Sequence, residues 1–232
     1  MSIYWEYNEL TKDTLIERLE NLTGFVEELA LGGNYLTEVP AFYDYMQLDA
    51  LDELWLNYNR ISHLVWGNIP WMTIVADFSH NQVNSIQVVG EYIPCFQLKV
   101  LRLNNNNLQT VERGQIPVSV EYLDLSSNRI SALGDLSEVL LRNLDIAYNN
   151  LTTLRGAHLP LSLERLDIFE NTISTVTNAS HLMNLGYITP CRSITRNACG
   201  LYERPCHPYT EVLKCGQCDY FKTLFPGTAV KC

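Results

Sequence analysis

The sequence predicts an α/β solenoid, a fold in which short strands stack side by side as one long parallel sheet. An asparagine recurs seven times at intervals of 21 to 25 residues. Apolar residues stand eight, five and three positions before nearly every one of these asparagines, and two positions after it. This spacing fits neither the alternation of a single strand nor the stripe of a helix. A fixed period of this length indicates a repeat architecture, in which each copy adds one unit to a continuous core.

Residues 120–133, VEYLDLSSNRISAL, contain one complete repeat. After a short strand over 122–125 the chain turns sharply, which leaves buried amides and carbonyls that cost about 1 to 3 kcal/mol each if unpaired. A carboxamide carries two donor hydrogens and an acceptor. We therefore expect the stacked asparagines to satisfy these groups repeat after repeat. They are Asn34, Asn59, Asn81, Asn106, Asn128, Asn149 and Asn171.

This pattern resembles the signature of the leucine-rich repeat family, LxxLxLxxNxL, which six of the seven copies match fully. The copy at Asn81 is the weak one, because Thr73 and Ala76 stand where leucines belong. The resemblance implies a curved, right-handed superhelix whose parallel sheet lines the concave side. It predicts seven repeats over residues 26–180 and leaves the function open, since one fold hosts many functions.

The opposite, convex side is predicted to be mostly non-helical. Pro70, Pro117 and Pro160 each lie eleven residues before their asparagine. Proline fixes φ and lacks an N–H, which favours extended or 3₁₀ segments over helix. The two 25-residue repeats carry inserts, over 41–50 and 88–96, that can each hold a turn of helix. Trp66 and Trp71 either fill the space left by the weak repeat or form an exposed convex patch.

Residues 1–25 are predicted to cap the N-terminal end of the solenoid with a helix. Within TKDTLIERLENLTG, Thr14 and Glu17 fit a capping box, and Gly24 can end the helix. Its apolar face would consist of Leu15, Leu19 and Leu22. Such a cap covers the core of the first repeat, as the end of a solenoid requires.

Residues 181–232 are predicted to form a cysteine-rich C-terminal cap. The net charge changes from −13 over residues 1–190 to +3 over 191–232, and together these give the −10 of the whole chain. So small a unit needs disulfides or a metal to be stable. Disulfide candidates are Cys191, Cys199, Cys206, Cys215, Cys218 and Cys232. The alternative is a zinc site that combines Cys215 and Cys218 of CGQC with two of Cys199, Cys206 and His207.

Composition excludes several classes of function. A pI near 4.9 argues against nucleic-acid binding, and no apolar stretch approaches the ~20 residues of a membrane span. No motif typical of hydrolases, zinc proteases or phosphate binding occurs, so no enzyme activity and no cofactor beyond the alternative zinc is expected. The first residues, MSIYWEYNEL, lack the features of a signal peptide. The crowded cysteines nevertheless favour an oxidising setting, extracellular or in a virus particle, over the cytosol.

Outward-facing strand positions define a candidate site on the concave face, because alternate strand residues face opposite sides. The central position gives Trp55, Asp77, Arg102, Asp124, Asp145 and Asp167, and Tyr122 and Phe169 occupy flanking positions. One interpretation is an acidic groove for a basic protein segment, with aromatic anchors at its sides. The other is a solvated acidic stripe that binds nothing, since aspartate at this position is common in the family.

The predicted function is therefore a non-catalytic protein–protein interaction module, whose ligand is a protein with a basic surface. The alternative is a structural component of a larger assembly such as a virus particle, or a surface recognition protein of a pathogen. The sequence leaves the partner and the oligomeric state open.

Overall fold

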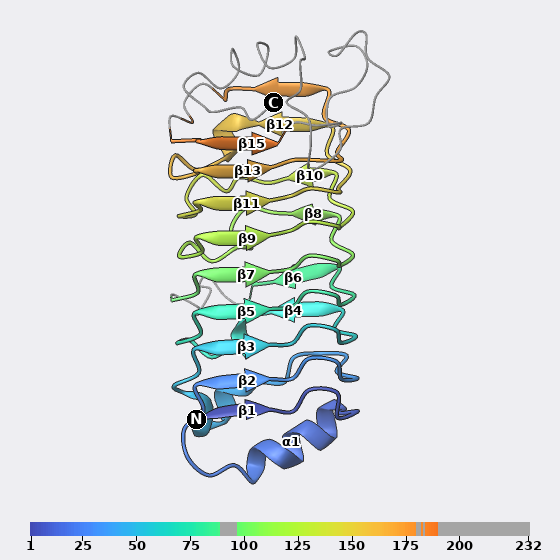
Figure 1. The fold of residues 1–232 in the computed structure, drawn as a ribbon, viewed down its shortest axis with the longest axis vertical. Helices are drawn as coiled ribbons and strands as arrows, with labels where there is room; N and C mark the ends of the chain where they lie inside the picture. The colour runs from blue at the N-terminus through green and yellow to red at the C-terminus, as the bar shows by residue number, and fades with distance from the viewer. Residues whose placement is uncertain (89–96, 180–181, 183, 190–232) are drawn as a thin grey trace, which may run out of the picture.

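A nine-stranded parallel sheet runs through the described part of the chain (Figure 1). The computed structural model describes residues 1–88, 97–179, 182 and 184–189. The strands of the long sheet are β1 (Ser2–Tyr4), β2 (Glu28–Ala30), β3 (Glu53–Trp55), β5 (Val75–Asp77), β7 (Val100–Arg102), β9 (Tyr122–Asp124), β11 (Asn143–Asp145), β13 (Arg165–Asp167) and β15 (Tyr187–Thr189). Seven of them, β2 to β13, come from the seven predicted repeats. The predicted parallel solenoid sheet is thus confirmed.

Strand β1 extends the sheet beyond the first predicted repeat, and its sequence explains why. In IYWEYNEL, Ile3, Trp5, Asn8 and Leu10 match the second half of the repeat signature. Ile3 pairs in register with Leu29 of β2 and is buried like it. The first half of the signature is missing, which is why a search for whole repeats passes over this strand.

Each of the seven repeat asparagines is buried and bonded in the same way. The Asn128 Nδ2 atom donates to the carbonyls of Leu103 and Leu125, at 2.9 and 3.0 Å, and its Oδ1 accepts from the Leu108 N–H at 3.0 Å. One side chain therefore satisfies groups of its own repeat and of the preceding one. Seven such side chains form a continuous ladder through Asn34, Asn59, Asn81, Asn106, Asn128, Asn149 and Asn171.

The weak third repeat keeps the register of its neighbours. Ala76 pairs with Leu54 on one side and Leu101 on the other. Thr73, Ala76 and Phe78 are all fully buried. The large ring of Phe78 lies two residues from the small side chain of Ala76, so this repeat still contributes apolar volume to the core.

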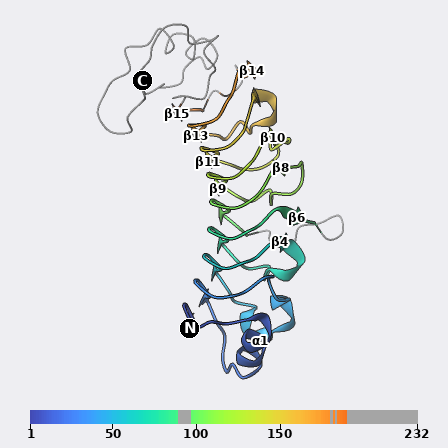
Figure 2. The same cartoon turned by 90° about the vertical axis from the view of Figure 1, so that its right-hand side faces the viewer.

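Among the described residues, the convex side carries three separate two-stranded parallel sheets (Figure 2). They pair β4 (His63–Val65) with β6 (Ser85–Gln87), β8 (Thr110–Val111) with β10 (Ala132–Leu133), and β12 (Thr153–Arg155) with β14 (Thr175–Thr177). Residues that pair are 22 apart in the sequence in all three sheets. Across the breaks the corresponding spacing is 25 residues, from Ser85 to Thr110, or 21 residues, from Ala132 to Thr153. Convex pairing thus follows repeat length, because an added or deleted residue shifts one strand out of register.

Short 3₁₀ segments complete the convex side, in agreement with its predicted non-helical character. They are η1 (Phe42–Asp44), η2 (Met46–Leu48), η3 (Trp66–Asn68) and η4 (Gly156–His158). The insert over 41–50 therefore holds two helical turns of the 3₁₀ type. The insert over 88–96 lies almost wholly outside the described residues, as do the six cysteines of the predicted C-terminal cap.

Trp66 spans the break between β6 and β8. Its side chain is fully buried, and its Nε1–H donates to the Gln115 carbonyl at 2.7 Å, although the two residues are 49 positions apart. The Gln115 amide in turn donates to the carbonyl of Ile86 at 3.0 Å. Trp66 therefore occupies space at the weak repeat, whereas Trp71 is 54% exposed.

The helix α1 (Lys12–Glu20) lies beneath β1 at the N-terminal end (Figure 1). Leu15 and Leu19 on its inner face are fully buried. The predicted capping box at Thr14 and Glu17 is wrong: Thr11 is the N-cap, and the Thr14 hydroxyl accepts from the Thr11 N–H at 2.9 Å. A threonine at the third helical position replaces the usual glutamate, which moves the start of the helix one turn earlier. The helix also ends at Glu20, before Gly24.

Candidate functional site

The predicted central positions of the long sheet lie in one continuous row. Strand pairing places Trp55 beside Asp77, Asp77 beside Arg102, and Arg102 beside Asp124. The row continues through Asp145 to Asp167. Neighbouring strands are about 4.8 Å apart, so these six side chains form a line along the outer face of the sheet.

Three predicted site residues meet around a fourth, Arg102. Its guanidinium lies over the rings of Trp55 and Tyr122, 5.6 and 5.9 Å from their centroids. The same group forms an ion pair with Asp77 Oδ2 at 3.7 Å. Such cation–ring contacts are worth about 0.5 to 2 kcal/mol each, depending on solvation. We call Trp55, Asp77, Arg102 and Tyr122 the Arg102 cluster.

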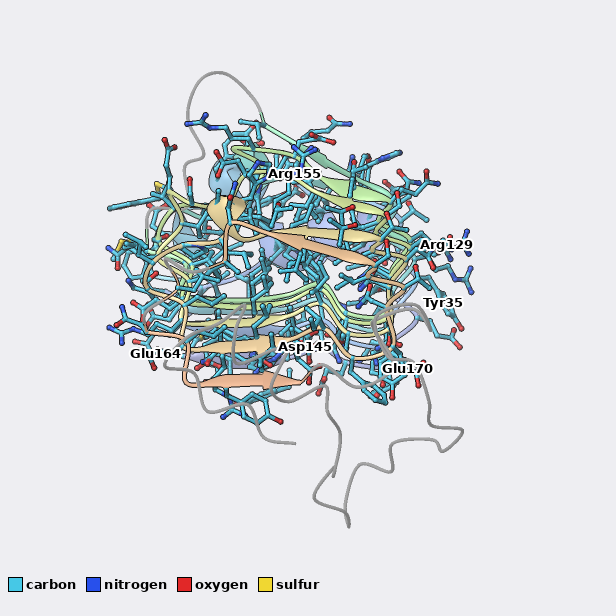
Figure 3. The ribbon with its side chains drawn as sticks, turned by 90° about the horizontal axis from the view of Figure 1, so that it is seen from above. Tyr35, Arg129, Asp145, Arg155, Glu164 and Glu170 are labelled. Atoms are coloured by element: carbon cyan, nitrogen blue, oxygen red, sulfur yellow. The ribbon has the colours of Figure 1, made fainter. Side chains whose placement is uncertain are left out.

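Asp124, Asp145 and Asp167 follow the Arg102 cluster on the next strands, and we call them the acidic row. In each, Oδ1 accepts from the backbone N–H two residues later, at 2.9 Å in Ser126, 2.9 Å in Ala147 and 3.0 Å in Phe169. This bond fixes the turn that follows the strand, which gives the aspartates a structural role. The acidic row lies on the sheet side of the molecule, where Asp145 is labelled in Figure 3.

Asp145, the central member of the acidic row, has a raised pKa. The pKa of Asp145 is raised to about 6, chiefly by burial and then by the neighbouring carboxylates of Asp124 and Asp167, against the lowering effect of the Ala147 N–H. The pKa of Tyr122 is raised as well, chiefly by burial and then by Asp124 and Asp145. Burial therefore contributes more to both rises than the neighbouring carboxylates do.

Replacing Asp145 with asparagine is expected to stabilise the protein at pH 7.5 but not at pH 4. Because the pKa is about 6 in the folded state and about 3.9 in an unfolded chain, ionisation of Asp145 opposes folding as the pH rises through this range. Asparagine removes the charge and keeps an oxygen for the Ala147 N–H. We expect a gain of about 1 kcal/mol at pH 7.5, reduced from the full linkage value because the group is partly solvated.

Thermal unfolding of Asp145→Asn and the original protein across pH 4 to 8 measures this effect. Asp49→Asn replaces an exposed aspartate in the turn before β3 and is the matched control for the loss of one carboxylate. A constant difference in melting temperature at all pH values would contradict a raised pKa of Asp145 as the cause.

Phe169 lies apart from the other predicted aromatics. It packs edge-on against Tyr148, with ring centroids 5.4 Å apart, beside the turn that precedes the ladder asparagine Asn149. On the same side, Tyr58 stacks on His80 with centroids 4.1 Å apart. Sequence reasoning missed Tyr58, His80 and Tyr148. Their signal is positional, because each stands immediately before a ladder asparagine, where the backbone adopts a positive φ near 55°.

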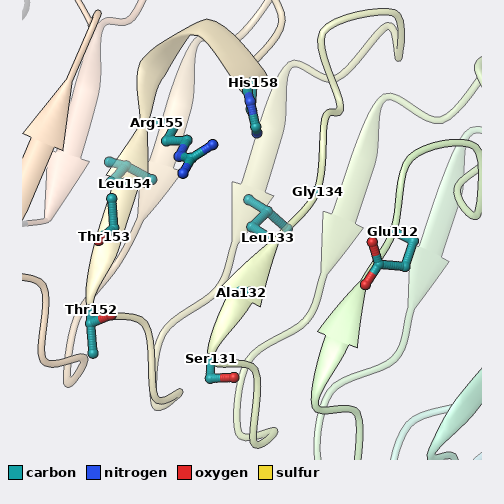
Figure 4. Close-up of a pocket in the computed structure, with 10 residues that line it drawn as sticks. All are labelled: Glu112, Ser131, Ala132, Leu133, Gly134, Thr152, Thr153, Leu154, Arg155 and His158. Carbon is teal, nitrogen blue, oxygen red and sulfur yellow. The ribbon is translucent and has the colours of Figure 1, made fainter.

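A hollow of about 400 Å³ opens on the convex side, at the break between β10 and β12 (Figure 4). Glu112, Thr153, Arg155 and His158 give it a polar lining, and Leu133 and Leu154 an apolar one. The His158 Nδ1 atom is buried there without a hydrogen-bond partner. No sequence-predicted site residue lies in this hollow.

Within the described residues, no three side chains of the metal-binding types are grouped to hold a metal ion. The cysteines proposed for zinc or disulfides lie outside these residues. In the same part of the chain, no helix is long and apolar enough to cross a membrane.

No protein-family model matches the chain, and no curated protein matches its sequence. Solved structures do match. A chain of the Drosophila Toll–Spatzle complex aligns with 77% of this chain at 21% identity, with a TM-score of 0.58. The leucine-rich repeat domain of APL1B aligns with 92% at 19% identity and a TM-score of 0.56, and a leucine-rich repeat protein of Leptospira interrogans with 98% at 20% and 0.52. The chain has the leucine-rich repeat fold.

This leucine-rich repeat chain spans 26%, 66% and 64% of the lengths of those three matched chains. At these identities the likeness concerns the fold and does not transfer a ligand. The leucine-rich repeat fold accounts for the Asn ladder and for the outward rows of the long sheet. The side chains that occupy these rows are particular to this chain.

Proposed function

We propose that the chain is a non-catalytic protein-interaction module that binds a basic protein segment along the acidic row. The observation that carries the proposal is the alignment of three carboxylates on adjacent strands, the central one of which, Asp145, has its pKa raised to about 6. Burial is the main cause of this rise, and repulsion from Asp124 and Asp167 adds to it; a lysine or arginine side chain placed over the acidic row would offset that repulsion. An extended or helical basic segment could supply one such charge to successive strands.

The Arg102 cluster supports a protein ligand over a small cation. Trp55 and Tyr122 are half-buried and flank a guanidinium that is already paired with Asp77. Aromatic and arginine side chains are enriched where interfaces gain most of their affinity. We propose that basic residues of the partner lie over Asp124, Asp145 and Asp167, and that its apolar residues contact the Arg102 cluster.

The similarity to solved structures supports the class of function only. One of the matched structures is a complex of Toll with a protein, Spatzle. The fold is therefore compatible with protein binding, and the basic character of the partner rests on this chain's own acidic row.

A synthetic peptide tests the proposal without knowledge of the natural partner. We expect a peptide of about ten residues, alternating lysine and alanine, to bind at pH 7.5 and low salt, measured by calorimetry, and the equivalent glutamate peptide not to bind. Asp145→Asn should weaken binding about 3- to 10-fold, as expected for the loss of one close charge pair. Lowering the pH through 6 should weaken binding to the original protein, because protonation of Asp145 removes the same charge.

Asp49→Asn changes the net charge equally, at a site away from the acidic row, and is the control. Equal weakening by both variants would mean that only overall charge matters and would overturn the proposal. Should Trp55→Ala and Tyr122→Ala leave capture of a natural partner intact, the alternative role as a structural component of an assembly would gain support.

A further inference from the structure

A stripe of exposed apolar side chains runs along one flank of the solenoid, at the turns that lead into the strands of the long sheet. Trp71, Val118, Leu140 and Leu161 precede β5, β9, β11 and β13 and are 54%, 56%, 55% and 61% exposed. The turns before β9 and β11 are adjacent, since the Leu140 N–H donates to the Val118 carbonyl at 2.9 Å, whereas β7 lies between the strands that follow Trp71 and Val118. Single exposed apolar residues are ordinary, but an aligned series marks an interaction surface. We call this surface the entry flank.

A ladder of alternating charges crosses the same flank. Lys99 Nζ pairs with Glu121 Oε1 at 2.8 Å, Arg142 Nε with Glu121 Oε2 at 3.5 Å, and Arg142 Nη1 with Glu164 Oε1 at 2.7 Å. Each residue stands directly before its strand, from β7 to β13. Glu164 points outward on the side opposite Tyr35, Arg129 and Glu170 (Figure 3). All four side chains are about half exposed, so they can contact a second molecule while remaining paired.

The order of the charges selects one arrangement of two copies. From β7 to β13 the charges are plus, minus, plus and minus, carried by Lys99, Glu121, Arg142 and Glu164. From β13 to β7 the order is minus, plus, minus and plus. A twofold axis between β9 and β11 therefore places Glu121 of one copy against Arg142 of the other, and Lys99 against Glu164. A parallel arrangement would place like charges together. Complementary charges of this kind fix orientation and register at an interface.

The same axis brings the two central apolar residues of the entry flank together. Val118 of one copy lies opposite Leu140 of the other, at the centre of the contact. A twofold contact is self-complementary by definition, and here one operator matches both this apolar pair and the charges.

We propose that the chain forms an antiparallel homodimer through the entry flank, with its twofold axis between β9 and β11. The contact leaves the acidic row and the Arg102 cluster free, so it is independent of the function proposed above. Because a few apolar side chains and ion pairs make a contact at the small end of the known range, we expect a dimer that dissociates on dilution, with a Kd of about 1 to 100 µM.

Sedimentation of the full chain from about 0.5 to 200 µM, a range that brackets the expected Kd, tests the proposal. We expect a monomer–dimer equilibrium, and we expect Leu140→Glu to raise the dissociation constant at least about 30-fold. Tyr148→Glu is the matched control, because Tyr148 is equally exposed on the opposite flank and Glu170 already occupies the corresponding turn position. A denatured, non-reduced sample must run as monomer, since a dimer joined through the tail cysteines would be a different contact.

Two charge reversals test the axis itself. Glu121→Arg alone and Arg142→Glu alone should each be monomeric, because each places like charges across the twofold axis. An equimolar mixture should restore association, since both of these positions are basic in the first variant and acidic in the second. The proposal is overturned if the original protein stays monomeric at about 200 µM, if Tyr148→Glu dissociates it as strongly as Leu140→Glu, or if the mixture of folded variants does not associate.

Discussion

Asn128→Leu is expected to lower the free energy of unfolding by about 3 to 5 kcal/mol, although it makes a buried position more apolar. The substitution leaves the carbonyls of Leu103 and Leu125 and the N–H of Leu108 without the partner that Asn128 provides. Each buried polar group left unpaired costs about 1 to 3 kcal/mol, and leucine regains part of this through burial of its side chain. Chemical denaturation followed by circular dichroism measures the difference.

Asn150→Leu is the control for this experiment. Asn150 is exposed and next to the ladder residue Asn149, and its replacement should change stability by less than about 0.5 kcal/mol, as surface substitutions do. Equal effects of Asn128→Leu and Asn150→Leu on the free energy of unfolding would show that the asparagine ladder does not stabilise the fold. A loss confined to the Asn128 variant would support the view that hydrogen bonding, rather than apolar content, specifies this position.

The long sheet could be predicted because every repeat has the same spacing of apolar residues and asparagine. Leu123, Leu125 and Asn128 recur at fixed spacing, so the register of one strand determines the register of the next. Even the weak repeat follows its neighbours, with Ala76 in line between Leu54 and Leu101. The convex side was less predictable, because its pairing depends on the exact number of residues between strands, and this number varies between repeats.

The candidate site also has one part that the sequence predicts and one part that it does not. In a parallel sheet, residues one repeat apart lie side by side, so the repeat period alone predicts the central row. The row consists of Trp55, Asp77, Arg102, Asp124, Asp145 and Asp167. The packing of Arg102 against Trp55 and Tyr122 depends on side-chain conformations that no period encodes. The raised pKa of Asp145 depends on burial. Contacts between distant positions, such as that of Trp66 with Gln115, are not part of the repeat pattern and cannot be predicted from it.

Trp66→Ala is expected to destabilise the protein by about 3 to 5 kcal/mol, the range for removal of a large buried aromatic side chain. Its indole is fully buried at the break between β6 and β8, where no convex strand pairing among the described residues links the two strand pairs. The substitution also leaves the Gln115 carbonyl without its donor. Because a solenoid is held together by contacts between neighbouring repeats, a weakened link here should let the two halves unfold separately.

Circular dichroism and tryptophan fluorescence during denaturation would reveal this loss of cooperativity as two transitions that no longer coincide. Trp66→Phe separates packing from hydrogen bonding: it keeps most of the apolar contact, loses the donor, and should cost about 1 to 2 kcal/mol. Trp71→Ala removes an equally large but exposed ring and should leave both stability and cooperativity within about 0.5 kcal/mol of the original. If Trp71→Ala were as damaging as Trp66→Ala, the bridge from Trp66 to Gln115 would not be what joins the two halves of the convex side.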